Sequence, residues 1–403
     1  MNIKRKIFTL YEMIAFMLLT AVISSLTCGF IMFKAYENKK PIKDYSSLTE
    51  NEHLLELINN YNQINDKFYQ KIDEGKLVDH AIKGMLDYLG EPYTEYIEED
   101  RTNGFNEQLQ GTYEGIGVEM TVNPVTKQIY VKRVFPDSPA EEAGVLVGDI
   151  FLKVNGEDVK DEDLQAISEK IKYGDSPTSV ILFLRGEEEI ELSLTRKKVE
   201  IISAYGRVIE YKRKKVGYLH ITSFAALTNE QVRKALKEFK HDGIKEVIID
   251  VRDNTGGYLD AVVKIAEQFI EKGKRILYLE AKDAKNAIID STDEKSDLKI
   301  VVLVNGASAS ASEILAAALR ETYGAKLVGN KTFGKGKFQE TGQLSTGASI
   351  KFTAGTWYTP NDVNIDGVGL TPDYEVVLDE KYYLERIDAN DNQLQKALEV
   401  VTK

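Results

Sequence analysis

The stretch from residue 300 to residue 319, IVVLVNGASASASEILAAAL, joins an apolar strand to a helix through a turn of small residues. The run Ile300–Val304 is continuously apolar, as a strand buried on both faces of a sheet should be. Strands and helices alternate around it: strand 216–221 with helix 229–239, strand 246–251 with helix 259–271, strand 300–304 with helix 310–321, and then strand 326–328. This alternation predicts an α/β core built on a largely parallel sheet.

Ser310 stands at the turn between this strand and its helix. A helix begins with unpaired backbone N–H groups and the positive end of the helix dipole. Such groups can stabilise an attacking alkoxide and the oxyanion that it forms. Ser310 and Glu313 also fit the S-x-x-E capping box, a purely structural motif, so this segment alone leaves both interpretations open.

A second motif, TFGKGKFQ, covers residues 332–339. Glycines on both sides of Lys335 allow unusual backbone angles and close approach. Burial disfavours the ammonium form of a lysine, so Lys335 could serve as a general base. Gln339 would share a face with Lys335 on a strand or a helix and could hold the amine by a hydrogen bond. The structural alternative is a glycine-rich surface loop.

The third motif, DVRDNTGG, covers residues 250–257 at the end of a predicted strand. The N–H group of Gly256 or Gly257 would suit an oxyanion hole, although a tight turn is the simpler interpretation. The motif does not contain the G-x-G-x-x-G spacing of a dinucleotide site.

The region before this core divides into two parts. Apolar residues recur at helical spacing from residue 54 to residue 68, and a second helix is expected at 77–89, ending at Gly90. Residues 111–196 are different: short strands are expected at 128–134, 150–154, 180–184 and 190–194, with a helix near 164–171. This predicts a small domain made mostly of strands.

The N-terminus predicts a membrane anchor. Basic residues at 4–6 precede a run without a charged residue from Met13 to Phe33. At about 1.5 Å per residue, a helix of this length spans roughly 30 Å, the thickness of the hydrocarbon core. The alternative, a cleaved signal peptide, is disfavoured because no A-x-A site precedes Lys34. Basic residues on both sides leave the orientation open.

Composition excludes several classes of protein. A chain of 403 residues calls for more than one domain. A net charge of −12 argues against nucleic acid as a partner. The single cysteine, Cys28, rules out an intrachain disulfide, and the four histidines show no metal-binding spacing. We expect neither a metal nor another cofactor.

Together the motifs resemble the carboxyl-terminal processing, or tail-specific, serine peptidases. The resemblance covers nearly everything after residue 49 and includes the SASASE, F-G-K-G-x-x-Q and D-V-R-x-N-x-G-G segments, Thr359-Pro360 and Thr371-Pro372-Asp373. It implies a multidomain α/β protein whose peptidase core is of the ClpP/crotonase type. It also implies a soluble part outside the cytoplasm, and therefore a single-pass protein of the cell membrane.

The resemblance assigns a role to each motif. It implies that Ser310 is the nucleophile, that Lys335 is the base and that Gln339 supports the base. The oxyanion donors would be Ala311 and one of the glycines, Gly256 or Gly257. Thr255 is a departure, because the family often has proline there.

The small domain resembles a PDZ domain of the peptidase type in residues 137–149 and 154–156. The resemblance implies that Gly115, Ile116, Gly117 and Val118 form its carboxylate-binding loop. Such loops bind a terminal carboxylate through backbone N–H groups while the peptide adds a strand. Lys172 stands where the family often has arginine, which puts a gating role of that residue in question.

The expected function is a serine endopeptidase that recognises protein substrates by their free C-terminal tails. The alternatives are a catalytically silent PDZ adaptor that only binds tails, and a Ser-His-Asp hydrolase using Ser310, His220 and Asp250. The apolar helices at 49–89 and 392–401 would build a homo-oligomer, with a dimer favoured, or would pack within the subunit.

The expected parts of the chain run in this order: a cytoplasmic segment (1–12), the transmembrane anchor (13–33), a linker (34–48), a helical region (49–110), the PDZ domain (111–196), the Ser-Lys peptidase core (197–380) and a C-terminal helical segment (381–403).

Overall fold

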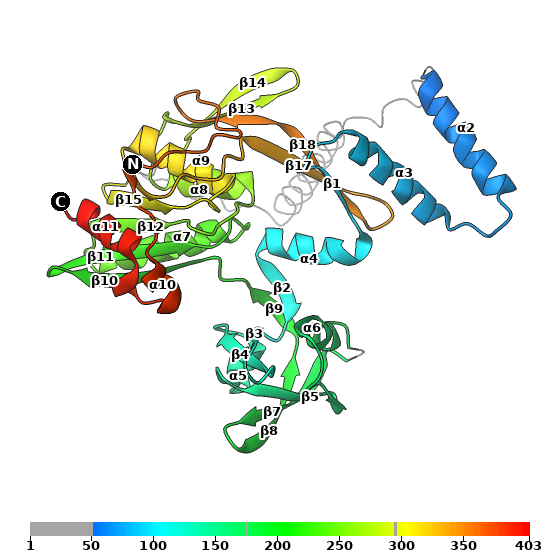
Figure 1. Ribbon diagram of the computed structural model, residues 1–403, viewed down its shortest axis with the longest axis horizontal. Helices are drawn as coiled ribbons and strands as arrows, with labels where there is room; N and C mark the ends of the chain where they lie inside the picture. The colour runs from blue at the N-terminus through cyan, green and yellow to red at the C-terminus, as the bar shows by residue number, and fades with distance from the viewer. Residues whose placement is uncertain (1–50, 175, 294–295) are drawn as a thin grey trace, which may run out of the picture. The chain divides into compact units, whose positions relative to one another are not determined.

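The computed structural model describes residues 51–403, apart from residues 175, 294 and 295 (Figure 1). The predicted membrane anchor at 13–33 lies outside the described residues. Among the helices that are described, none is both long and apolar enough to cross a membrane. The chain divides into two units, residues 1–78 and 79–403, and each is described by itself.

Two amphipathic helices follow the undescribed N-terminal residues. The side chain of Asn51 caps α2 (Glu52–Lys67) by accepting a hydrogen bond from Leu54 N at 3.2 Å. The next helix, α3 (Glu74–Tyr88), begins earlier than the sequence predicted, and Gly90 follows it with a φ of 61°. Neither helix has a buried residue, so apolar side chains such as Leu57 and Ile64 are exposed.

The core of the second unit is a six-stranded sheet in the order β10-β11-β12-β15-β16-β19. All neighbours after β11 run parallel, and β10 is antiparallel to β11. This confirms the predicted parallel α/β core. Its strands are β10 (Ala204–Tyr211), β11 (Lys214–Ile221), β12 (Glu246–Asp250), β15 (Lys299–Val304), β16 (Lys326–Gly329) and β19 (Tyr374–Glu375).

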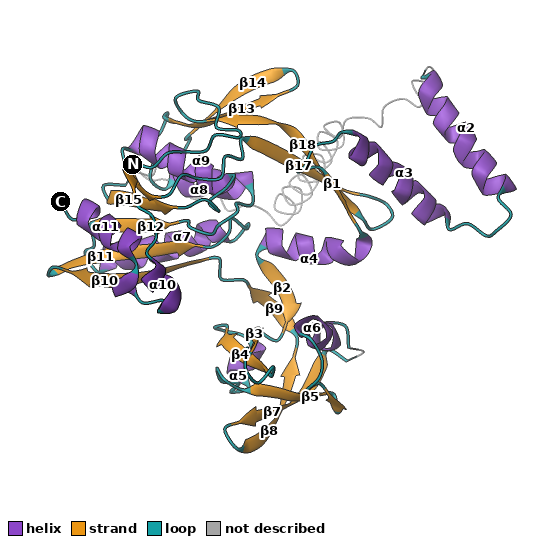
Figure 2. Cartoon of the chain, in the orientation of Figure 1, coloured by secondary structure: helices purple, strands orange, loops and turns teal. Residues whose placement is uncertain are grey.

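Helices cover both faces of this sheet (Figure 2). On one face, α7 (Thr228–His241), α8 (Leu259–Glu267) and α9 (Ala311–Ala318) pack on Ile249 and Val302. The helix predicted for 310–321 thus ends at Ala318 and continues as a π-helical turn, Leu319–Tyr323.

The C-terminal segment covers the other face of the sheet. It comprises α10 (Glu380–Leu384), a 3₁₀ turn (Asp388–Asn390) and α11 (Asn392–Val401). Leu394 and Leu398 of α11 are each 1% exposed and pack with Ile248 and Val301. The apolar face of this helix is therefore buried within its own subunit, which was one of the two predicted possibilities.

A second sheet, which the sequence analysis missed, has the order β1-β18-β13-β14, with β17 also paired to β18. The residues of β18 alternate between polar and apolar from Ser349 to Ala354, but most of them are half-buried, so neither face of the strand is a buried apolar face. The strands are β1 (Glu95–Ile97), β13 (Arg275–Ala281), β14 (Ala284–Ile289), β17 (Lys337–Gln343) and β18 (Ser349–Tyr358). Pairing of Glu95 with Lys351 joins chain from before the small domain to chain from after it.

The small β-rich domain contains the predicted strands and its own core of Val131, Phe151, Ile181 and neighbours. A two-stranded sheet, β2 with β9, stands at the two chain ends of this domain. The elements are α4 (Glu99–Gln110), β2 (Thr112–Gly115), β3 (Val118–Val122), β4 (Ile129–Val134), α5 (Pro139–Glu142), β5 (Ile150–Val154), β6 (Glu157–Asp158), α6 (Leu164–Lys172), β7 (Thr178–Arg185), β8 (Glu188–Thr195) and β9 (Lys197–Glu200).

A buried ion-pair cluster ties the C-terminal segment to the end of β12. The Arg252 guanidinium, 9% exposed, donates to Asp250 at 2.7 Å and to Asp391 at 2.8 Å. Asp391 also caps α11 by accepting from Leu394 N. The Tyr218 hydroxyl donates to Asp250 at 2.7 Å, so both buried carboxylates are paired.

We predict that Arg252→Met lowers the free energy of unfolding by about 3–5 kcal/mol, because two buried carboxylates lose their cation. Arg207→Met is the matched control: Arg207 pairs with Asp388 of the same C-terminal segment but is 42% exposed, and its loss should cost less than about 1 kcal/mol. Urea denaturation followed by the fluorescence of Trp357, the only tryptophan, measures both. Equal costs for the two variants would contradict this account of the cluster.

Candidate active site

Ser310 occupies a strained turn directly before α9. Its φ of 54° and ψ of −115° lie outside the regions that side-chain-bearing residues usually adopt. Such backbone strain costs of order 1–3 kcal/mol and persists only where the surroundings hold it. The neighbouring turn contributes to this: a Cβ at Gly256 would lie 2.9 Å from Cβ of Ser310, so only glycine fits there.

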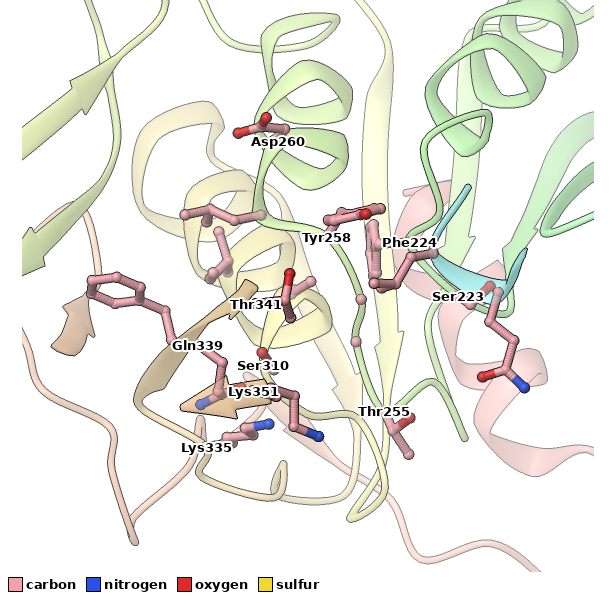
Figure 3. A pocket seen from close by; sticks show the side chains of 18 of the residues that line it. Ser223, Phe224, Thr255, Tyr258, Asp260, Ser310, Lys335, Gln339, Thr341 and Lys351 are labelled. Carbon is pink, nitrogen blue, oxygen red and sulfur yellow. The ribbon is translucent and has the colours of Figure 1, made fainter. Parts of the chain in front are cut away.

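The two neighbouring serines are engaged in holding this turn. Ser308 Oγ donates to Val251 O at 2.7 Å, and Ser312 Oγ donates to Asn254 O at 2.8 Å. Both are fully buried. Ser310 is therefore the serine of this segment whose side chain is left to face the cavity (Figure 3).

The carboxylate of Glu313 connects the serine turn to the lysine loop. It is fully buried and accepts a hydrogen bond from Ser310 N at 2.9 Å, as a helix cap would. It also accepts from Thr332 Oγ1 at 2.6 Å, from Gly334 N at 2.7 Å and from Lys335 N at 2.9 Å. The sequence identified Glu313 as a helix cap but gave no sign of its bonds to residues 332–335.

Lys335 lies in an irregular segment before β17, not on a strand. The indole of Trp357 donates to its carbonyl oxygen at 2.9 Å. The half-buried side chain places Nζ 4.3 Å from the ring centroid of Tyr93. Burial, and next the positive charge of Lys351, hold the pKa of Lys335 below its ordinary value, while Glu91, Glu95 and Glu313 act in the opposite direction.

Gln339 lies on β17 just after a bulge between Phe338 and Gln339. Its Nε2 donates to Thr353 Oγ1 at 3.4 Å, and no hydrogen bond joins it to Lys335 among the described residues. The expectation that Gln339 shares a face of one strand or helix with Lys335 is therefore wrong, because β17 begins only at Lys337 and the bulge shifts its register.

The two glycines differ in what their N–H groups do. Gly256 N donates to Asn254 Oδ1 at 2.9 Å. Gly257, with a φ of 147°, packs against Phe224 so closely that a Cβ there would lie 2.3 Å from Phe224 O. Within the described part of the chain, no hydrogen bond is formed by the N–H of Gly257 or of Ala311.

All the catalytic and oxyanion residues expected from the sequence line one cavity of about 670 Å³ (Figure 3). The cavity thus brings together Ser310, Ala311, Gly256, Gly257, Lys335 and Gln339 from three separate segments. Thr255 and Lys351 line it as well, and Phe338, Ile314 and Trp357 give it apolar walls. Phe333, two residues before Lys335, is 55% exposed and does not line the cavity.

The alternative triad does not assemble. His220 pairs in register with Asp250, as parallel neighbours would. However, side chains alternate along β11: Leu219 and Ile221 face the layer of α9, so His220 and Tyr218 face the opposite layer, that of α11. The ring of His220 hydrogen-bonds to the Tyr205 hydroxyl at 2.8 Å and does not line the cavity.

The sequence analysis missed two residues beside the base, Tyr93 and Lys351. Tyr93, whose ring lies beside Lys335 Nζ, stands just before β1. Lys351 lies on β18 and forms an ion pair of 2.7 Å with Glu95 of β1. Because the strand pairing that brings them together spans the whole small domain, the local sequence held no signal for it.

Comparison with known proteins shows which families the parts of the chain resemble. The profile of peptidase family S41 matches residues 215–376, that of the PDZ domain matches residues 130–186, and that of the activating protease CtpB N-terminal domain matches residues 24–101. The chain is 36% identical over 368 residues to a "Probable CtpA-like serine protease" of Staphylococcus aureus (strain COL), covering 90% of this chain and 71% of that protein. A protein of the same description from Staphylococcus haemolyticus (strain JCSC1435) is 37% identical over 320 residues, 78% of this chain and 63% of that one.

Among solved structures, an S41 protease from Bacteroides fragilis matches with a TM-score of 0.54 at 18% identity, covering 83% of this chain and 91% of that one. At that identity the likeness shows the fold alone.

The surroundings of Lys335 predict two opposite shifts in the pH dependence of Ser310 reactivity. Lys351→Gln removes a positive charge, so the pKa of Lys335 rises and the acid limb moves to higher pH. Tyr93→Leu removes a ring that favours the ammonium by about 0.5–2 kcal/mol, so the limb moves to lower pH by about half a unit or more.

The measurement is the rate at which Ser310 reacts with a fluorophosphonate as a function of pH. Tyr93→Phe keeps the ring and is the control, which should leave the limb in place. Shifts of the same sign in Lys351→Gln and Tyr93→Leu would contradict the assignment of Lys335 as the titrating group.

Proposed function

Because the chain belongs to peptidase family S41 and is a serine peptidase of the CtpA-like type, we propose that it cleaves protein chains with Ser310 as nucleophile and Lys335 as general base. The observation that carries this proposal is the single cavity lined by Ser310, Lys335 and the oxyanion candidates. The buried Glu313 fixes the backbone of both reacting residues at once.

In the proposed reaction, Ser310 Oγ attacks the scissile carbonyl carbon while its proton passes to the neutral amine of Lys335. The carbonyl oxygen becomes an oxyanion, which the N–H groups of Ala311 and Gly257 stabilise. We favour Gly257 over Gly256 because the Gly256 N–H is already bonded to Asn254.

The tetrahedral intermediate then collapses. The C–N bond breaks, the Lys335 ammonium returns its proton to the leaving amine, and the acyl group stays on Ser310. In the second half, Lys335 takes a proton from water, which attacks the ester and releases Ser310 with its proton restored.

Two features of the base suit this role. An unperturbed lysine titrates near about 10.4 and would be almost wholly charged at neutral pH. Burial and Lys351 lower the pKa of Lys335, which enlarges the neutral fraction. In the structure its Nζ lies over Tyr93, so the amine must turn from the ring toward Ser310 for proton transfer. Gln339, held by Thr353, stands in the same cavity as a hydrogen-bonding support for the turned amine.

We predict that Ser310→Ala and Lys335→Ala each reduce hydrolysis of casein by at least about a thousandfold, because nucleophile and base act as one unit. Lys337→Ala is the matched control: Lys337 pairs with Glu91 at 3.4 Å and does not line the cavity, so activity should persist. If activity is lost in Lys337→Ala but kept in Lys335→Ala, the general base is Lys337 and not Lys335. If neither wild type nor Ser310→Ala cleaves casein, the silent adaptor is the function that remains. If both cleave it at the same nonzero rate, Ser310 is not the nucleophile.

We further propose that substrates are selected by their C-terminal tails on the small domain. A cavity of about 240 Å³ is lined by Gly115, Ile116 and Val118. Gly117 has a φ of 86°, and a Cβ there would lie 2.1 Å from Cβ of Ser138. The carbonyls of Ile116 and Gly117 accept hydrogen bonds from Ala140 N at 2.8 Å and Phe135 N at 2.9 Å. Their carbonyls thus point into the domain, which leaves the loop N–H groups for a carboxylate.

The expected consequence is that one peptide tail is cleaved faster as a free acid than as a C-terminal amide, because the amide removes the negative charge that the loop recognises. Steady-state kcat/KM for the two forms gives the comparison. Equal values would show that the tail carboxylate is not recognised.

Two further proposals concern where the chain is located in the cell and whether it forms a dimer. We propose that the uncharged run 13–33 anchors the chain in the membrane with the catalytic part outside the cytoplasm, which fractionation of full-length and 1–33-deleted chains would check. The exposed apolar side chains of α2 and α3 favour a homodimer, which light scattering would detect.

A further inference from the structure

The hydroxyl of Tyr113 is a buried polar group without a partner. Tyr113 lies on β2, immediately before the Gly115–Val118 loop, and its Oη is buried with no hydrogen-bond partner among the described residues. Buried hydroxyls are nearly always bonded, and leaving one unpaired costs free energy. The unpaired Tyr113 hydroxyl is explained if a ligand that binds beside it supplies the missing hydrogen-bond partner.

The ring of Tyr113 is fixed in place. A Cβ at Gly115 would lie only 2.4 Å from Cε2 and 2.8 Å from Cδ2 of Tyr113, so one edge of the ring lies against the loop glycine. On its other side it meets Phe135 edge to face, with ring centroids 6.4 Å apart. The hydroxyl therefore keeps its place beside the loop.

That place is within the proposed tail-binding cavity. Tyr113 lines the cavity of about 240 Å³ together with Gly115, Ile116 and Val118. Burial raises the pKa of Tyr113 to about 12, against an opposing effect of the Gly117 amide, with Glu107 adding to the rise. The hydroxyl thus stays protonated at any physiological pH and can act as a donor.

The only cation among the described residues that line this cavity, Lys172, already has a partner, and Glu114 adds a second carboxylate to the lining. Lys172 and Glu107 both line it and form an ion pair with each other. A ligand that paired with Lys172 would have to displace Glu107, whereas one that accepts from Tyr113 displaces nothing. The Gly117 N–H faces the hydroxyl oxygen and lowers the pKa of Tyr113, so the partner that the Tyr113 O–H lacks is an acceptor. Its position beside the loop N–H groups favours an anion.

We infer that the Tyr113 hydroxyl donates a hydrogen bond to the C-terminal carboxylate of a protein tail bound on the Gly115–Val118 loop. This inference rests on the tail recognition proposed above and adds a side-chain donor to the backbone N–H groups of the loop. Tyr113 then distinguishes a free C-terminus from an internal peptide segment, which has no carboxylate to accept the bond.

The test uses the full chain carrying Ser310→Ala, so that bound peptides are not cut. A fluorescent peptide with an apolar tail, as free acid and as C-terminal amide, is titrated into this protein with and without Tyr113→Phe, and binding is followed by anisotropy. We expect Tyr113→Phe to weaken binding of the acid about tenfold, in line with a hydrogen bond to a charged acceptor, and to leave the amide unchanged. Tyr130→Phe, on β4 of the same domain, is the control and should change neither.

If the Tyr113 hydroxyl had a purely structural role, Tyr113→Phe would lower the thermal midpoint of unfolding. Because the Tyr113 hydroxyl is unpaired in the free protein, Tyr113→Phe should leave the thermal midpoint unchanged or raise it while tail binding weakens. An equal loss for acid and amide, or no loss for the acid, would overturn the inference. If wild-type protein prefers the acid but Tyr113→Phe binds it equally well, this inference alone fails. If wild type binds acid and amide alike, the proposed tail recognition fails with it.

Discussion

The buried carboxylate of Glu313 is the constraint on which the site depends. One side chain accepts hydrogen bonds from the backbone of Ser310 and of Lys335, and from Thr332 and Gly334 between them. Each bond stabilises an ionised carboxylate that has no contact with water, so losing any of them leaves the others to carry a buried charge. The strained backbone of Ser310 persists because the hydrogen bond to Glu313 and the close packing of Gly256 both hold the residue in place.

Around this fixed centre, the electrostatics of the base are balanced by residues far away in the sequence. Burial and Lys351 favour the neutral amine of Lys335, while the ring of Tyr93 favours the ammonium. Lys351 is itself held by Glu95 of β1. The segment just before α4 therefore influences the protonation of Lys335, the proposed base, next to the larger effect of burial.

The two regions of proposed function differ in whether their buried polar side chains are hydrogen-bonded. In the catalytic region, Ser308, Ser312 and Glu313 are buried and fully bonded, which makes the turn rigid. In the tail-binding region, Tyr113 is buried and unbonded. In the proposed function, the first arrangement preorganises the reacting groups before a substrate arrives, and the second keeps a donor for the tail of the substrate.

The sequence by itself determined the parallel core and the small β-rich domain, because each rests on a local pattern of apolar runs, helix periodicity and glycines at turns. It also singled out Ser310, Lys335 and Gly256 or Gly257 as candidates, whose roles the family resemblance implies. Tertiary structure alone decided that Glu313 joins two loops, that Lys335 precedes its strand, that His220 faces the wrong layer, and that α11 packs on its own sheet. The sheet around β18 was missed although Ser349–Ala354 alternate between polar and apolar residues, because β1 pairs with β18 across the whole small domain. Contacts between distant segments depend on register and packing, which a local pattern does not encode.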